Sequence, residues 1–142
     1  MEDGLVKSDR LVTVFGGSGF VGRHVVGALA QQGWRILVAV RRPDLAFHLQ
    51  PLGTPGQIHA VQANLRYPES VAHALRDAQA VINLVGILHE SGAQRFDAIH
   101  HLGAQSLAKA AKQAGTEVFV QVSAIGADPS GSSDYAKTKA FG

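Results

Sequence analysis

The chain contains no cysteine, and aromatic residues make up only 6% of its 142 residues. Without cysteine, neither a disulfide framework nor a thiolate metal site can form. No apolar run is long enough to span a bilayer, and the first ten residues are too charged to form the apolar core of a signal peptide. We therefore expect a protein without a transmembrane segment, with the cytoplasm as its default location.

A strong charge of one sign is also missing. The 13 lysines and arginines nearly balance the 11 acidic residues, which leaves a net charge of +2. The basic residues are scattered, and only Arg41 and Arg42 are adjacent. This distribution provides no basic face or tail, so we expect no nucleic-acid partner.

Apolar runs typical of buried strands alternate along the chain with patterns typical of helices. We predict strands over residues 11–15, 35–40, 58–62, 80–85 and 118–122. We predict helices over residues 20–32, 67–76 and 96–114, and a short helix that Asp44 caps and that ends near Leu49. This alternation predicts an α/β fold, a Rossmann-type doubly wound parallel sheet with strand order 3-2-1-4-5. The ligand is expected over the carboxyl ends, where the first and fourth strands diverge.

The length fits one domain, which we assign to residues 11–142, with residues 1–10 as an N-terminal tail. Sheets of this type usually continue to a sixth strand. We therefore expect residues 11–142 to be the N-terminal part of a longer protein whose later strands lie outside this chain.

A glycine-rich turn joins the first predicted strand to the first predicted helix. Gly16, Gly19 and Gly22 follow the spacing G-x-x-G-x-x-G. Glycines let the chain turn sharply, let backbone amides approach a diphosphate at a helix N-terminus, and let the helix pack closely on the strand. The remaining residues of this candidate phosphate site are Ser18, Phe20 and Val21. The alternative is a purely structural glycine turn, but the strand before it and the helix after it favour nucleotide binding.

Two arginines follow the second predicted strand, at the position where dinucleotide sites select the cofactor. An acidic residue there binds the ribose hydroxyls of NAD, whereas an arginine accommodates the extra phosphate of NADP. Arg41 and Arg42 therefore predict a preference for NADP(H), with NAD(H) as the second choice. The alternative is a pair of solvated arginines at the end of a strand.

Several stretches together resemble the short-chain dehydrogenases/reductases of the extended or atypical kind. They are the glycine turn of residues 16–22, Asn64-Leu65, the run Asn83-Leu84-Val85-Gly86, and Tyr135-Ala136-Lys137-Thr138-Lys139. More closely, the chain is similar to the group formed by the nucleotide-binding accessory subunits of respiratory complex I and their bacterial relatives.

The resemblance implies roles for further residues. Tyr135 would exchange a proton with the substrate oxygen, and Lys139 would favour the phenolate and hold the nicotinamide ribose. Their spacing places both on one face if that segment is helical. Val85 and Gly86 would contact the cofactor. Asn64 and Leu65 stand where the family has an Asp-hydrophobic pair that contacts adenine, and the asparagine amide retains a donor and an acceptor for that contact.

The resemblance also fails at two positions of the family's active site. Ala124 stands where a serine or threonine orients the substrate, although Ser123 could serve if the register differs by one residue. His100 replaces an asparagine that supports a proton relay. The adjacent pair His100-His101 does not indicate a metal site, because neighbours on a helix do not face each other and no other ligand set accompanies them.

Two functions from different classes therefore remain open. The chain could be the nucleotide half of a reductase, dehydrogenase or epimerase, with Tyr135 as general acid/base. Alternatively, it binds NADP(H) as a structural or sensing ligand, as the complex I resemblance implies, with respiratory complex I or a quinone as partner. In the second case the protein lies at the periphery of a membrane complex. Ala124 and His100 favour the second function, whereas Tyr135 and Lys139 favour the first.

Overall fold

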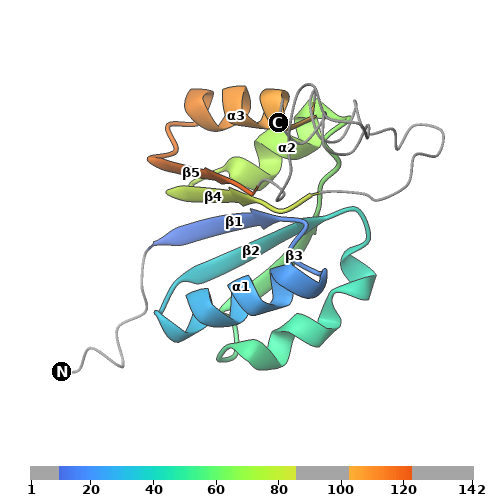
Figure 1. Cartoon of the computed structure of the whole chain (residues 1–142), viewed down its shortest axis with the longest axis vertical. Coiled ribbons are helices and arrows are strands. Elements are labelled where there is room, and N and C mark those ends of the chain that lie inside the picture. The colour runs from blue at the N-terminus through green and yellow to red at the C-terminus, as the bar shows by residue number, and fades with distance from the viewer. Residues whose placement is uncertain (1–9, 86–102, 123–142) are drawn as a thin grey trace, which may run out of the picture.

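Five parallel strands form one sheet in the order β3-β2-β1-β4-β5 in the computed structural model (Figure 1). The structure describes residues 10–85 and 103–122. The strands are β1 (Leu11–Phe15), β2 (Arg35–Val40), β3 (Ile58–Gln62), β4 (Ala80–Asn83) and β5 (Val118–Gln121). The observed order confirms the predicted Rossmann-type sheet. The first three strands also have the predicted bounds, and β5 ends one residue earlier than predicted.

β4 ends at Asn83 rather than at the predicted residue 85, because the buried Asn83 side chain redirects the backbone. Its Oδ1 accepts a hydrogen bond from the amide of Val85 at 3.1 Å. Its Nδ2 donates to Oε1 of Gln121 in β5 at 2.8 Å. These bonds satisfy the buried amide and fix the carboxyl ends of β4 and β5 relative to each other.

Helices cover both faces of the sheet (Figure 1). One face carries α1 (Phe20–Gln31), and the other carries α2 (Pro68–Leu75) and α3 (Gly103–Gln113). The three helices lie within the ranges predicted for them. Residues 96–102 of the longest predicted helix lie outside the described residues.

The alternation of side chains along β1 explains why the strand is apolar on both faces. Val12 and Val14 pack in a cluster with Val26 of α1. Phe15 points the other way and packs with Leu75 of α2 and Leu107 of α3 in a second cluster. A parallel strand covered on both faces needs such a continuous apolar run.

The segment after β2 differs from the predicted short helix. It forms two 3-10 helices, η2 (Pro43–Leu45) and η3 (Phe47–Leu52), with Pro51 inside the second. Proline lacks the amide that an α-helix interior needs, so the segment uses short i→i+3 turns. Asp44 does not cap a helix, because its carboxylate instead pairs with Arg42.

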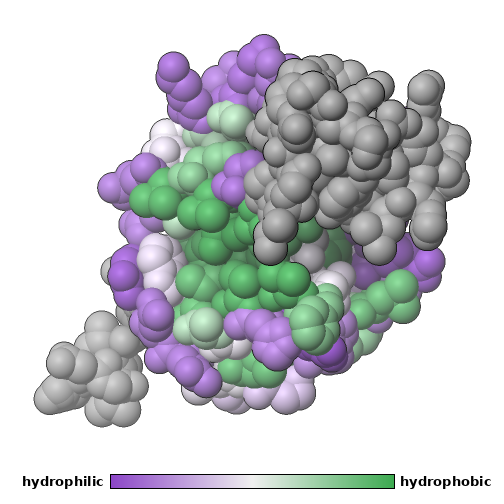
Figure 2. Space-filling model, in the orientation of Figure 1, coloured by the Kyte–Doolittle hydropathy of each residue, from purple (hydrophilic) through white to green (hydrophobic). Residues whose placement is uncertain are grey.

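One face of β5 and of Val122, which follows it, remains exposed in the described part of the chain. Val118, Val120 and Val122 are 53%, 43% and 36% exposed, whereas the intervening Phe119 packs against the cluster beneath α2 and α3. Figure 2 shows this apolar surface continuing over β4 beside α1. The predicted sixth strand stays a prediction.

Candidate functional site

The turn between β1 and α1 lies at the carboxyl ends of the strands, where β1 separates β2 from β4. Gly16 has a φ of +78°, a left-handed conformation that favours glycine. A Cβ at Gly16 would lie 3.0 Å from the amide nitrogen of Val85. The Gly16 amide donates to the carbonyl of Ala39 in β2 at 3.0 Å. Gly16 therefore turns the chain and packs it between the ends of β2 and β4.

Gly22 brings α1 onto this turn. A Cβ at Gly22 would lie 2.4 Å from both the carbonyl carbon and the carbonyl oxygen of Gly17. No real Cβ tolerates backbone at that distance, so either the helix or the turn would have to move. Gly22 thus has the packing role expected of the third glycine.

Replacing Gly22 with alanine is expected to destabilise the fold by about 3 kcal/mol, the upper end of ordinary overpacking costs. The reason is the clash with the Gly17 backbone, which has no flexible side chain to give way. Chemical denaturation with an unchanged m-value measures this loss. Gly27→Ala is the control in the same helix, because a Cβ at Gly27 meets no described atom within 4 Å. Equal stability of the two variants would contradict the packing role.

Gly19 is different, because space is open around it. Its φ of −80° and ψ of −172° suit any residue, and the nearest described atom to an added Cβ would be the Gly16 carbonyl oxygen, 3.9 Å away. Gly19 is the N-cap of α1, and within the described chain no side chain caps the helix and no acidic residue lies in its first turn. The first-turn amides and the helix dipole are therefore available to an anion.

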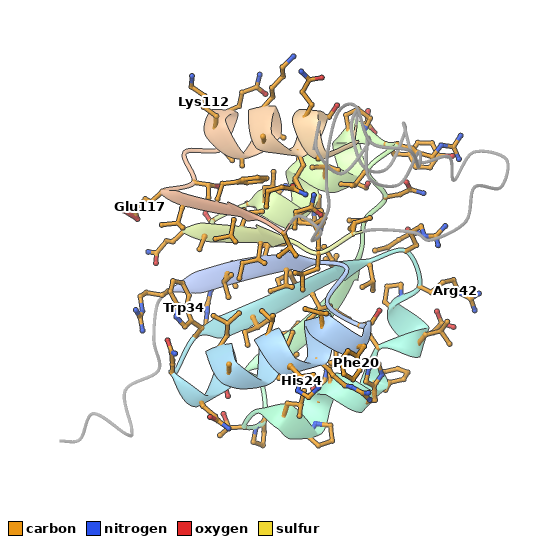
Figure 3. The ribbon with its side chains drawn as sticks, viewed as in Figure 1. Phe20, His24, Trp34, Arg42, Lys112 and Glu117 are labelled. Atoms are coloured by element: carbon orange, nitrogen blue, oxygen red, sulfur yellow. The ribbon has the colours of Figure 1, made fainter. Side chains whose placement is uncertain are left out.

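The side chains that follow Gly19 are exposed. Phe20 and Val21 are 70% and 54% exposed. The Phe20 ring meets the His24 ring edge-on at 5.1 Å between centroids, and the Arg23 guanidinium lies 5.3 Å from the Phe20 centroid. Figure 3 shows Phe20 and His24 at the N-terminal end of α1, at the same end of the sheet as Arg42.

A contact from η3 to the turn was not predicted from the sequence. Nε2 of His48 lies 3.1 Å from the carbonyl oxygen of Ser18. The two residues are thirty positions apart. No local pattern joins them, so only the packing of η3 beside α1 brings them together.

The two arginines at the end of β2 have different surroundings. Arg41 and Arg42 are both exposed residues. Arg42 donates to both carboxylate oxygens of Asp44, at 3.2 Å from Nε and 2.9 Å from Nη2. These hydrogen bonds lower the pKa of Asp44 from its ordinary value and raise that of Arg42. Arg41 makes no ion pair or hydrogen bond with another described side chain. Its positive charge is thus available to a ligand.

The remaining predicted cofactor contacts also follow strands. Asn64 and Leu65 come directly after β3, where Oδ1 of Asn64 accepts the amide of Arg66 at 2.9 Å in a tight turn. Leu65 packs against the cluster beneath α2 and α3. Val85 follows β4 and lies beside Gly16. Their adenine and cofactor contacts stay predictions.

Several predicted site residues lie outside the described residues. They are Gly86, Ser123, Tyr135 and Lys139, together with Ala124 and His100 at the two positions that depart from the family pattern. Their roles remain those that the sequence predicts.

The described residues contain no group of three or more His, Cys, Asp or Glu side chains able to hold a metal ion. None of the helices that the structure describes is both long and apolar enough to cross a membrane. The chemistry that the described site offers is anion binding by backbone amides, with a cation at the end of β2.

Comparison with known proteins agrees with this geometry. A family model for NAD(P)H-binding proteins matches residues 16–142. The chain is 38% identical to the mitochondrial NADH dehydrogenase [ubiquinone] 1 alpha subcomplex subunit 9 of Arabidopsis thaliana over 92% of its own length and 33% of that protein. It is 33% identical to the ceramide reductase of Caulobacter vibrioides, over 93% of the chain and 40% of that enzyme.

A solved structure is similar as well. The chain superposes with a TM-score of 0.79 and 26% identity on a Bacillus halodurans protein assigned as an NAD-dependent epimerase or dehydratase, over 93% of this chain and 62% of that one. The chain therefore spans less than half the length of these two curated relatives, 33% and 40%, and 62% of this structure.

Proposed function

This chain belongs to the NAD(P)H-binding family, and we propose that its glycine turn holds the diphosphate of NADP(H). The observation that carries the proposal is the contrast within the turn. Gly16 and Gly22 are closely packed against backbone, whereas Gly19 has open space at an uncapped helix N-terminus. A diphosphate fits here because the first-turn amides and the dipole of α1 favour negative charge. Gly19 also has no side chain that would keep the diphosphate away from the backbone.

The proposed cofactor site extends along the carboxyl ends of the strands. Arg41 would bind the 2′-phosphate of the adenosine ribose, and Asn64 and Leu65 would contact the adenine. Val85 and Gly86 would line the site beyond β4, and Lys139 would hold the nicotinamide ribose.

The preference for NADP(H) rests on the charges at the end of β2. Arg42 balances the charge of Asp44 through its two hydrogen bonds, so this acid does not repel a phosphate nearby. Among residues 10–85 and 103–122 no side chain balances the charge of Arg41, and its guanidinium matches phosphate geometry.

We expect NADPH to bind about 30-fold more tightly than NADH, which corresponds to charge-assisted bonds worth on the order of 2 kcal/mol. Arg41→Ala should remove most of this difference in affinity between NADPH and NADH. Changing both Arg41 and Arg42 to alanine should remove the remainder. Calorimetric titration of both nucleotides measures it. Arg35→Ala is a control, because Arg35 is also exposed but begins β2, at the opposite end of the strand from Arg41, and should leave the preference unchanged. Equal affinity of the unmutated protein for NADPH and NADH would show that Arg41 and Arg42 are solvated surface residues with no role in choosing the cofactor.

We further propose that NADP(H) is a structural or sensing ligand and that the protein associates with respiratory complex I at the periphery of its membrane. This is supported by the similarity to alpha subcomplex subunit 9 and by Ala124 and His100, which depart from the family's active site. A quinone is the small-molecule partner consistent with such a position.

The second candidate function is an active NAD(P)-dependent reductase or epimerase. It is favoured by the Tyr135-x-x-x-Lys139 spacing and by the similarity to ceramide reductase, which is an enzyme by name. In this case Tyr135 is the general acid/base, and Ser123 takes the orienting role that Ala124 cannot fill.

One experiment tests the nucleotide site itself. The whole protein is purified, any bound nucleotide is released by denaturation and identified, and the emptied protein is titrated with NADPH and NADH. We expect NADP(H) to be retained or rebound with one site per chain. A protein that neither retains nor binds either nucleotide would overturn the proposed function.

A further inference from the structure

The contact between His48 and the glycine turn has no role in the fold's core. His48 is exposed, as is the bond that it forms with the Ser18 carbonyl. Its neighbours in the segment, Ala46 and Leu49, are 2% and 1% exposed and pack in the same cluster as Val26 of α1. Buried residues therefore hold η3 in place beside α1 (Figure 1), and His48 reaches from this fixed support to the turn.

The Ser18 carbonyl belongs to the same peptide group as the Gly19 amide. All described peptide bonds are trans, so this carbonyl and this N–H point in opposite directions. A hydrogen bond to the carbonyl on one side therefore also fixes the direction of the N–H on the other side. A carbonyl can only accept, so Nε2 of His48 must be the donor, which both the Nε2–H tautomer and the imidazolium allow.

The Ser18–Gly19 peptide needs such a restraint more than other parts of the turn. Gly16 is held by the hydrogen bond from its amide to the Ala39 carbonyl and by the backbone of Leu84 and Val85 after β4, and Gly22 by its contact with Gly17. The Gly19 carbonyl accepts the Arg23 amide at 3.0 Å, but Gly19 has no side chain, an added Cβ would meet no described atom nearer than 3.9 Å, and glycine backbones have the greatest conformational freedom. Binding a ligand through a mobile peptide costs ordering entropy, which preorganisation removes.

We propose that His48 is a positioning residue that holds the Ser18–Gly19 peptide so that the Gly19 amide is preset for the diphosphate. The inference rests on the proposed nucleotide function and adds a residue to it. Its ligand class is any nucleotide that carries a diphosphate, with or without the 2′-phosphate. His48 thus differs from Arg41, which acts on the 2′-phosphate alone.

The test compares His48→Leu with His48→Gln in the whole protein, with ADP-ribose and NADPH as calorimetric probes. Loss of one positioning hydrogen bond predicts that His48→Leu weakens both ligands by the same factor, about five- to ten-fold. His48→Gln places an N–H donor at a similar reach and should restore most of the affinity. The NMR order parameter of the Gly19 amide in the ligand-free protein should fall in His48→Leu and not in His48→Gln, because it reports the mobility of that N–H directly.

His59→Leu is the matched control. Its Nε2 also lies 3.1 Å from a backbone carbonyl, that of Gly56, and His59 is likewise exposed, but it lies on β3 away from the turn. His59→Leu should bind both probes as the unmutated protein does. The melting temperature should be unchanged in His48→Leu, His48→Gln and His59→Leu.

The outcomes separate the two proposals. If the unmutated protein binds neither probe, the nucleotide function itself fails. If it binds both and His48→Leu binds them equally well, the positioning role is wrong. A loss that affects NADPH but spares ADP-ribose, or that glutamine does not restore, would also overturn it, because either result places the imidazole in another role.

Discussion

Replacing Gly19 with valine is expected to abolish nucleotide binding while leaving the fold intact. The backbone at Gly19 is extended, a conformation that valine adopts readily, and an added Cβ would approach no described atom nearer than 3.9 Å. The branched side chain would therefore fit the free protein but occupy the volume that the diphosphate needs. We expect at least a 100-fold loss of affinity for NADPH and NADH alike, measured by calorimetry, with a melting temperature close to that of the unmutated protein.

Two variants of the same segment make this result interpretable. Gly22→Ala should lower stability because its Cβ meets the Gly17 backbone, so a loss of binding there would follow from unfolding. Gly27→Ala adds a side chain to α1 farther along the helix, where it should leave nucleotide binding unchanged and raise stability by about 0.5–1 kcal/mol, since alanine favours a helix interior over glycine. Unchanged nucleotide affinity in a folded Gly19→Val protein would show that the diphosphate does not lie on this turn.

The sheet could be predicted because short patterns of apolar residues in the sequence mark its strands. β1 and β2 are short, largely apolar runs bounded by turn residues, and helices cover both faces of the sheet there, so burial and sequence pattern agree. The segment after β2 was predicted less well. Asp44 has the chemistry of a helix cap, but a partner two residues away, Arg42, binds its carboxylate instead.

The site shows the same division between local and distant contacts. The spacing of glycines between a strand and a helix predicts a sharp turn at Gly16 and close packing at Gly22, and the structure has both, while their contacts with a nucleotide stay predictions. The contact of His48 with Ser18 could not be found this way, because it depends on how η3 packs beside α1. The pairing of Arg42 with Asp44 is local, yet sequence alone could not show which arginine keeps its charge free.

Catalysis depends on residues beyond those that form the phosphate cradle. When bound, a nicotinamide cofactor supplies the hydride for carbonyl reduction. The chain must then place Tyr135 within hydrogen-bond reach of the substrate oxygen, and an orienting hydroxyl normally helps to hold that oxygen. By the family resemblance, Ala124, which has no hydroxyl, stands at the position of that group, and His100 stands at the position expected for the asparagine of the proton relay. A misplaced reacting group costs about 100-fold in rate.

We therefore expect the whole protein to bind NADPH but to reduce carbonyl substrates slowly, about 100-fold below an ordinary reductase of this family. The measurement is NADPH oxidation with a panel of aldehydes, ketones and quinones, in parallel for the unmutated protein and for Tyr135→Phe, Lys139→Met and Ala124→Ser. If binding is the main function, the residual activity should respond little to Tyr135→Phe, while Ala124→Ser should raise it by restoring an orienting hydroxyl. Vigorous turnover that disappears in Tyr135→Phe would instead make this protein an active reductase, with the neighbouring Ser123 as the orienting group.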